Sequence, residues 1–289
     1  MKPQLYTAVT GANSGIGFET TRALASENHR IFMICRNKRK AEEARDRIVK
    51  STENEKIDLI IGDLASLDSV RSIVERLGER SDRLDLLINN AGIIPGEREE
   101  TVDGYEKSFA VNHLAPFLLT HLTLGLLRNA SDARVINVAS EAHRAGKFEP
   151  ENLQLETGYN SIKAYANSKL FNIMFTHELA SRLQKTGITT YSLHPGTVRT
   201  NLDTGGGGGS LFAFLFKLGK PFMLSPKRGA KTSIYLATEP GIESLNGRYF
   251  KNRKEIKPLD IAYDRQKCRD LWEQSEKLAG IDKEEEVAT

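Results

Sequence analysis

Short apolar runs alternate along this chain with longer segments in which hydrophobic residues recur at helical spacing. The apolar runs predict strands at residues 5–9, 30–35, 57–61, 84–88, 134–139 and 189–193. The helical spacing predicts helices at residues 16–26, 38–50, 67–79, 104–128, 161–185, 226–237 and 261–279. Runs this apolar are typical of strands covered on both faces, as in parallel sheets joined by helical crossovers. The pattern therefore predicts an α/β fold, a doubly wound sandwich of three layers.

Length and composition favour one folded domain. The 289 residues approach the upper size of a single hydrophobic core, so we expect one domain over 1–281 and a charged tail at 282–289. The chain is 39% hydrophobic and 27% charged, a balance that argues against global disorder. Its net charge is only +3, with basic and acidic residues mixed, and this argues against a nucleic-acid partner.

The cysteines and the N-terminal sequence indicate the cellular compartment in which the protein is expected. Cys35 and Cys268 show neither CxxC nor Cys/His ligand spacing, so we predict two free thiols and no metal site. Strand-like sequence begins about five residues from the N-terminus, which leaves no room for a signal peptide. We therefore expect a cytoplasmic protein.

A glycine-rich turn, VTGANSGIG at 9–17, follows the first predicted strand and leads into the first predicted helix. Gly11, Gly15 and Gly17 permit a tight turn, close approach of a pyrophosphate, and close packing of helix on strand. The phosphates would lie at the helix N-terminus, where free amides and the helix dipole favour anions. The turn predicts a dinucleotide site, and a glycine turn without a ligand is the alternative.

The end of the second strand bears on the choice of cofactor. An acidic residue here usually binds the ribose hydroxyl of NAD, but this chain has CRNK at 35–38. Arg36 offers a planar fork that matches a phosphate, and Lys40 follows nearby. These residues favour NADP(H), unless they form only a solvated basic helix start.

Two more polar turns follow the third and fourth strands. Asp63 would accept a hydrogen bond from the adenine amino group, while Leu64 packs on the ring. The small residues Ala91 and Gly92, in NNAG at 89–92, would let the chain pass close to the ribose. Each turn also fits an ordinary loop after a strand.

Tyr165 and Lys169 are the candidates for proton transfer. Four residues apart in a predicted helix, they lie on one face. A phenol is a poor base at neutral pH, but a nearby ammonium and a cationic nicotinamide would lower its pKa. Ser140, at the end of the fifth strand, would orient the substrate oxygen against Tyr165 while hydride moves. A surface pair and a turn serine are the alternatives, and Ser140 lies in no hydrolase-type G-x-S-x-G elbow.

Pro116 falls inside the predicted helix 104–128. It cannot donate a hydrogen bond to the carbonyl of Asn112, so we expect a kink there. A freed Asn112 carbonyl facing the cleft would hold a water that links Lys169 to solvent; a carbonyl solvated elsewhere is the alternative.

Together these motifs resemble the short-chain dehydrogenase/reductase superfamily over essentially the whole chain. The resemblance rests on 10–17, 89–92, Asn112, Ser140, YxxxK at 165–169 and PG at 195–196. It implies a single Rossmann-type sandwich with a mostly parallel, seven-stranded sheet and a catalytic tetrad of Asn112, Ser140, Tyr165 and Lys169. With the residues above, the predicted cofactor-binding set is Gly11, Asn13, Ser14, Gly15, Ile16, Gly17, Arg36, Asn37, Lys40, Asp63, Leu64, Asn90, Ala91, Gly92, Tyr165, Lys169, Pro195, Gly196, Val198 and Thr200.

Several stretches resemble the retinol dehydrogenase branch and its WW-domain oxidoreductase relatives, among them 109–114, 164–169 and 192–197. That branch implies NADP(H) and a lipophilic alcohol or carbonyl substrate. Related folds often pair through the helices predicted at 104–128 and 161–185, so a homodimer is also considered. An NADP(H)-binding redox sensor or scaffold with little activity is the alternative function, and the intact tetrad favours the enzyme.

The segment 197–225 combines five glycines, at 205–209, with an oily stretch at 211–223. It is expected to form a substrate lid hinged at the glycines. A peripheral membrane contact through 211–223 and a short helix covering the core are the alternatives, since the stretch is too short to span a bilayer.

Overall fold

A computed structural model gives the structure of the protein and describes residues 4–198 and 224–281. Its sheet has the order β3-β2-β1-β4-β5-β6-β7-β8, and all pairs are parallel except β7 with β8. The strands are β1 Tyr6–Thr10, β2 Arg30–Cys35, β3 Ile57–Ile61, β4 Leu86–Asn89, β5 Arg134–Val138, β6 Thr189–Leu193, β7 Tyr249–Lys251 and β8 Lys254–Glu255. The predicted α/β sandwich is confirmed, with one more strand than the seven expected because β8, two residues long, turns back along β7.

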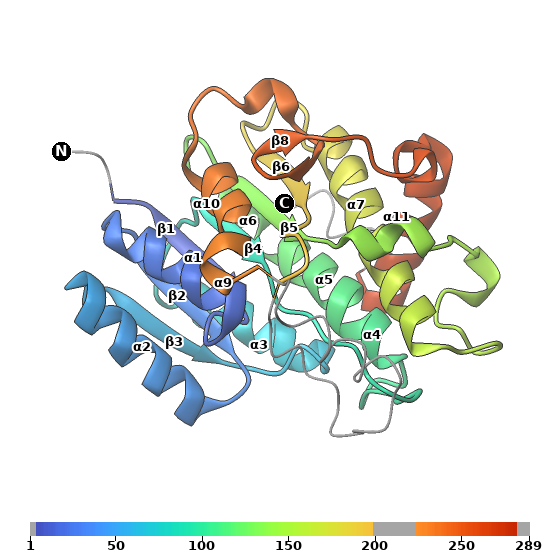
Figure 1. Ribbon diagram of the computed structural model, residues 1–289, viewed down its shortest axis with the longest axis horizontal. Coiled ribbons are helices and arrows are strands. Elements are labelled where there is room, and N and C mark those ends of the chain that lie inside the picture. Colours follow the sequence, from blue (N-terminus) through green and yellow to red (C-terminus); the bar gives the residue numbers. More distant parts are fainter. Residues whose placement is uncertain (1–3, 199–223, 282–289) are drawn as a thin grey trace.

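Helices cover both faces of the sheet (Figure 1). They are α1 Gly15–Ser26, α2 Lys38–Thr52, α3 Leu67–Gly78, α4 Lys107–Phe109, α5 Ala115–Leu122, α6 Leu124–Arg128, α7 Ser161–Arg182, α9 Pro226–Gly229, α10 Lys231–Thr238 and α11 Arg265–Ala279. Successive β2 residues alternate between two apolar clusters. Phe32 belongs to the cluster that includes residues of α3, α5, α7 and α11, and Met33 belongs to the cluster that includes residues of α1, α2 and α10. Both faces of the sheet are therefore buried, which explains why the strands lack polar alternation.

The predicted helix 104–128 is interrupted. A π-helical turn, Ala110–Leu114, lies between α4 and α5, and the Ala115 amide donates to the Ala110 carbonyl. Pro116 stands in the first turn of α5 and has no amide hydrogen for the carbonyl of Asn112. A widened turn therefore stands directly before the proline, and the predicted kink itself stays a prediction.

α11 packs against α7 and lies beside α5 (Figure 1). The Trp272 ring stacks on Phe175 with centroids 5.8 Å apart and meets Phe117 edge-on at 4.8 Å. The helix ends at Gly280, which adopts the left-handed conformation with φ +63°. Helix α11 therefore covers part of the surface of α5 and α7 that was considered for a homodimer. The homodimer stays a prediction.

The order of strands positions the site. From β1 the chain moves outward through β2 and β3, then returns to β4 on the other side of β1 and continues to β8. Ligands of doubly wound sheets bind at the carboxyl ends of the strands, beside such a reversal. Within the described residues no helix has the length and hydropathy needed to cross a bilayer. The glycine run, the oily stretch and the charged tail lie outside those residues.

Candidate active site

A groove of about 1050 Å³ runs along the carboxyl ends of the strands, from the glycine turn to α7. Every predicted cofactor-binding residue of the described chain lines it: Gly11, Asn13, Ser14, Gly15, Ile16, Gly17, Arg36, Asn37, Lys40, Asp63, Leu64, Asn90, Ala91, Gly92, Tyr165, Lys169, Pro195, Gly196 and Val198. Ser140 lines it too, whereas Thr200 lies outside the described residues. Residues predicted from separate motifs thus share one concave surface.

The glycine turn is shaped to receive a phosphate group. Gly11 and Gly15 have φ of +64° and +55°, the left-handed region that glycine adopts without strain. α1 begins directly after Ser14, whose side chain makes no capping hydrogen bond within the described chain. The first amides of α1 therefore point toward the groove end without a side-chain cap, as an anion site requires.

Hydrogen bonds hold the loop after β4 against the glycine turn. The hydroxyl of Thr10 accepts hydrogen bonds from the amides of Asn90 (2.9 Å) and Ala91 (3.0 Å). The side-chain amide of Asn90 donates to the Thr10 carbonyl at 2.9 Å. A Cβ on Gly17 would lie 2.3 Å from the Gly11 carbonyl oxygen and 2.5 Å from the Asn90 side chain. Thr10, which is absent from the predicted set, therefore holds two walls of the groove together.

The part of the groove at the start of α2 carries positive charge. Arg36 and Lys40 are exposed and line the groove at the start of α2. The Asn37 side chain accepts from the Lys40 amide at 2.9 Å, so it caps α2. Burial raises the pKa of the Cys35 thiol to about 12, although the amides of Ala12 and Asn13 hydrogen-bond it. The prediction that both cysteines are free thiols is confirmed.

At the other end, Tyr165, Lys169 and Ser140 converge. The Lys169 ammonium is buried, donates to the Val138 carbonyl at 3.0 Å, and lies 5.7 Å from the centre of the Tyr165 ring. Burial raises the pKa of the Tyr165 phenol, and a hydrogen bond with the Ser140 side chain partly offsets this. The expected lowering of the Tyr165 pKa by Lys169 is not found in the protein alone: burial raises this pKa, and the Lys169 ammonium donates to the Val138 carbonyl.

Burial of Lys169 makes stability depend on pH. Desolvation lowers its pKa to about 8 in the folded protein, below its value in the unfolded chain. Between these values the unfolded chain holds a proton that the folded protein has released, so stability should rise with pH. Relative to Lys169→Met, the cofactor-free wild type should gain about 2.5 kcal/mol between pH ~7 and pH ~10. Urea unfolding of both proteins across this range measures the difference, and a difference constant with pH would contradict the assignment.

Asn112 lies within the π-helical turn and is fully buried. Its side chain accepts from the Ile93 amide at 2.8 Å and donates to the Ile93 carbonyl and the Ser168 hydroxyl, each at 3.0 Å. A Cβ on Gly92 would lie 3.2 Å from the Lys169 nitrogen. The Asn112 side chain thus fixes the loop that passes Lys169, and its predicted catalytic role through the backbone carbonyl stays a prediction.

The groove has apolar walls near Tyr165 that the sequence motifs did not indicate. Ile93, Ile94, Val111 and Ala142 line the groove, and so does Ile162, a residue that is 45% exposed. Ile162 lies three residues before Tyr165 in α7, so helical spacing alone would have placed it on the same face.

Comparison with known proteins agrees with this geometry. Residues 6–206 match the family model described as short chain dehydrogenase. The chain is 41% identical over 279 residues to retinol dehydrogenase 12 of Homo sapiens, covering 96% of this chain and 87% of that protein. The chain therefore belongs to the short-chain dehydrogenase/reductase family, and it is an oxidoreductase that acts on CH–OH groups. Within that family it is retinol dehydrogenase-like.

Solved structures show the same fold. An uncharacterised protein from Mycobacterium paratuberculosis is 31% identical, with a TM-score of 0.77 over 96% of this chain and 94% of that chain. The active-site complex of Pseudomonas aeruginosa RhlG with NADP is 26% identical, with a TM-score of 0.66 over 85% and 93%. The predicted family and fold are confirmed.

Proposed function

We propose that the protein interconverts a lipophilic alcohol and its aldehyde or ketone with NADP(H), using Tyr165 as general acid and base. One observation carries the proposal: Tyr165, Lys169 and Ser140 converge in the same groove that the glycine turn and Arg36 line. Such a groove orders a dinucleotide along its length and leaves room for a substrate beside the phenol.

Each side chain has its own role in the proposed reaction. In reduction, the Tyr165 phenol gives its proton to the carbonyl oxygen of the substrate, and in oxidation its phenolate takes the alcohol proton. The Ser140 hydroxyl, within hydrogen-bonding distance of the phenol, orients the same oxygen. Lys169 favours the phenolate and binds the ribose hydroxyls. The nicotinamide supplies or accepts the hydride when it is bound.

A preference for NADP(H) rests on the adenosine end of the groove. Residues 36–40 contain no acid, and Arg36 and Lys40 both line the groove. An acid here would repel a 2′-phosphate, whereas a guanidinium can bind it through two hydrogen bonds. The similar RhlG structure is itself a complex with NADP, which supports the same choice.

Replacing Arg36 by Ala tests this preference. We expect the dissociation constant for NADPH to rise roughly 10-fold or more, because a charge-assisted bond to the 2′-phosphate is lost. The constant for NADH should change less than about twofold, because NADH lacks that phosphate. Fluorescence titration of the bound reduced nicotinamide measures both constants, and equal losses would count against the assignment.

A lipophilic substrate is supported by the apolar walls around Tyr165 and by the similarity to proteins named retinol dehydrogenases. A panel of retinal, medium-chain aldehydes and ketosteroids, followed by the loss of NADPH absorbance, tests it. If no compound of the panel is reduced although NADPH binds tightly, the sensor alternative is favoured. No feature of the groove supports a sensor over an enzyme. The cytoplasmic location and the membrane contact through 211–223 stay predictions.

A further inference from the structure

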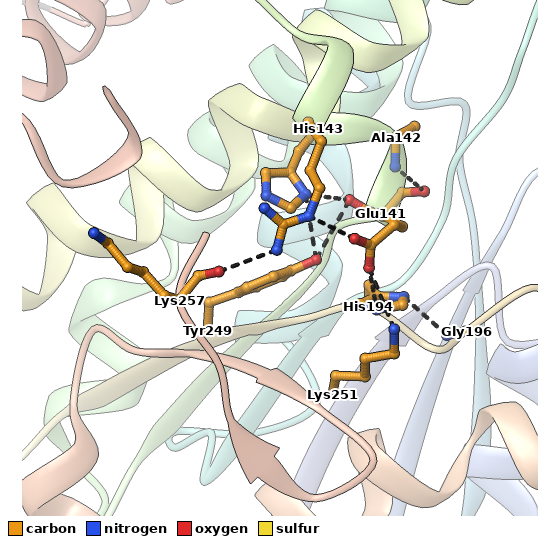
Figure 2. Close-up of polar contacts among 10 residues, drawn as sticks. Glu141, Ala142, His143, His194, Gly196, Tyr249, Lys251 and Lys257 are labelled. Carbon is orange, nitrogen blue, oxygen red and sulfur yellow. Dashed lines mark hydrogen bonds and ion pairs between the residues drawn. The ribbon is translucent and has the colours of Figure 1, made fainter. Parts of the chain in front are cut away.

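The backbone carbonyl of Ser140 is a point where buried hydrogen-bond donors meet. The His143 imidazole donates to it from Nδ1 at 2.7 Å, and the His143 amide donates at 3.1 Å. The Tyr249 hydroxyl lies 3.4 Å away, which is long for a bond between two oxygens, so the imidazole is the principal side-chain donor. Both rings are fully buried, and Figure 2 shows the imidazole beside the Tyr249 hydroxyl. Ser140 is therefore held through its carbonyl by side chains that do not line the groove.

The contact with the carbonyl defines the tautomer of His143. A carbonyl oxygen only accepts, so Nδ1 carries the ring proton and Nε2 carries the lone pair. Burial lowers the pKa of His143, and the charge of Arg144 lowers it further, against the Ser140 hydrogen bond and the charge of Glu141. The ring is therefore uncharged at neutral pH. Nε2 is buried without a hydrogen-bond partner in the described chain, a cost that an apolar side chain would avoid. What the imidazole adds at this position is the Nδ1 donor.

The carbonyl and the hydroxyl of Ser140 share one Cα, so a donor that fixes the first also orients the second. The hydroxyl accepts from the Ala142 amide at 3.2 Å and is hydrogen-bonded with the Tyr165 phenol. The 3₁₀ turn Glu141–Ala145 begins directly after Ser140. Without the imidazole, the carbonyl keeps only the amide bond of this turn and the long contact with Tyr249. The peptide after Ser140 is then freer to rotate, and the hydroxyl moves with it.

The turn that contains His143 lies directly against α7. The Gly146 amide donates to the His143 carbonyl at 2.9 Å, and a Cβ on Gly146 would lie 2.7 Å from the carbonyl oxygen of Ala166, the residue after Tyr165. The imidazole also meets the Tyr249 ring of β7 edge-on, with centroids 5.0 Å apart. Contacts with α7 and β7 thus fix the place from which the imidazole donates.

We propose that His143 is a positioning residue of the reaction: its Nδ1 proton holds the Ser140 carbonyl and thereby aims the Ser140 hydroxyl at the phenol and the substrate oxygen. The proposal rests on the function proposed above, because it assigns the Ser140 hydroxyl to the substrate oxygen. It predicts that removal of the Nδ1 donor slows the chemical step and leaves cofactor binding intact.

Two substitutions of similar shape test the donor. Asparagine and leucine branch at Cγ in the same way, but only asparagine can place a donor where Nδ1 lies. His143→Leu should lower kcat about 10-fold, because the hydrogen bond that orients Ser140 is lost. His143→Asn should keep kcat within about threefold of wild type, because its amide nitrogen can still donate to the carbonyl. The dissociation constant for NADPH should stay within about twofold in both variants, since the residues that line the groove are unchanged.

A double substitution shows whether His143 acts through Ser140. Ser140→Ala should lower kcat roughly 10²-fold on its own. In that background His143→Leu should lower kcat by less than about twofold more, because no hydroxyl is left to orient. His177→Leu is the matched control: it removes a half-buried imidazole of α7 that contacts the Tyr263 ring outside the groove, and it should leave kcat and NADPH affinity unchanged.

Thermal unfolding of every variant reports its stability. His143→Gln, whose amide reaches past the Nδ1 position, takes the place of His143→Leu if that protein does not fold. The proposal is wrong if the variants with and without the donor lose kcat equally, or if the effect of His143→Leu is undiminished in the Ser140→Ala background.

Crystal structures of the His143 variants give a measurement that needs no turnover. The distance between the Ser140 and Tyr165 side-chain oxygens should lengthen in His143→Leu and stay as in the wild type in His143→Asn. Equal distances in the two variants would contradict the positioning role. A wild type that binds NADPH and reduces no carbonyl would overturn the proposed function, and these distances would still decide whether His143 positions Ser140.

Discussion

Replacing Tyr165 by Phe should lower turnover by roughly 10²-fold to 10⁴-fold, while the affinity for NADPH stays within about twofold of wild type. The substitution removes one oxygen atom and keeps the ring beside which Lys169 lies, so the groove should keep its shape. Only the proton transfer and the hydrogen bond with the Ser140 side chain are lost. Loss of NADPH absorbance with a responsive aldehyde measures turnover, and fluorescence titration measures affinity.

Tyr159→Phe is the matched control for this substitution. Tyr159 precedes α7, and its hydroxyl donates to the carbonyl of Glu97 at 3.1 Å, apart from the residues that line the groove. Its removal should leave turnover unchanged. A Tyr165→Phe protein with the wild-type rate would overturn the proton-transfer role, and a protein that loses NADPH binding as well would show that the phenol shapes the groove.

The position of the site could be predicted because parallel strands end at one edge. Gly11, Asp63, Asn90, Ser140 and Pro195 each follow a strand directly or within two residues, and all five line the groove. Knowledge of the strands and their direction is enough to bring these residues together. The break before α5 could also be predicted from the sequence, because the lack of an amide hydrogen is a property of Pro116 itself.

Features that depend on tertiary burial could not be predicted. The rise in the pKa of the Tyr165 phenol comes from desolvation, which no spacing in the sequence reports. The contact of Tyr249 with the Ser140 carbonyl joins two segments far apart in the chain. β7 and β8, three and two residues long, are too short to show a periodic pattern. Local motifs therefore indicated which residues surround the groove but not the electrostatics within it.

Gly17→Ala should cause the largest loss of cofactor binding. The added Cβ would lie 2.3 Å from the Gly11 carbonyl oxygen and 2.5 Å from the Asn90 side chain, well inside contact distance. The first atom is backbone, so the glycine turn itself must move away from α1. A shift of about 1 Å would displace the amides that receive the pyrophosphate, and we expect NADPH binding to weaken roughly 10²-fold. Overpacking should also lower stability by about 1–3 kcal/mol.

Gly125→Ala separates this clash from the general effect of replacing a helical glycine. Gly125 lies within α6, and a Cβ there would meet no heavy atom of the described chain within 4 Å. Alanine is the better helix former, so this variant should gain about 0.5–1 kcal/mol and bind NADPH as the wild type does. Urea unfolding and fluorescence titration of both variants measure the two effects. If Gly17→Ala binds NADPH normally, the close approach of α1 to the Gly11 turn is not what shapes the phosphate site, and the site must then depend on the positive-φ glycines Gly11 and Gly15 alone.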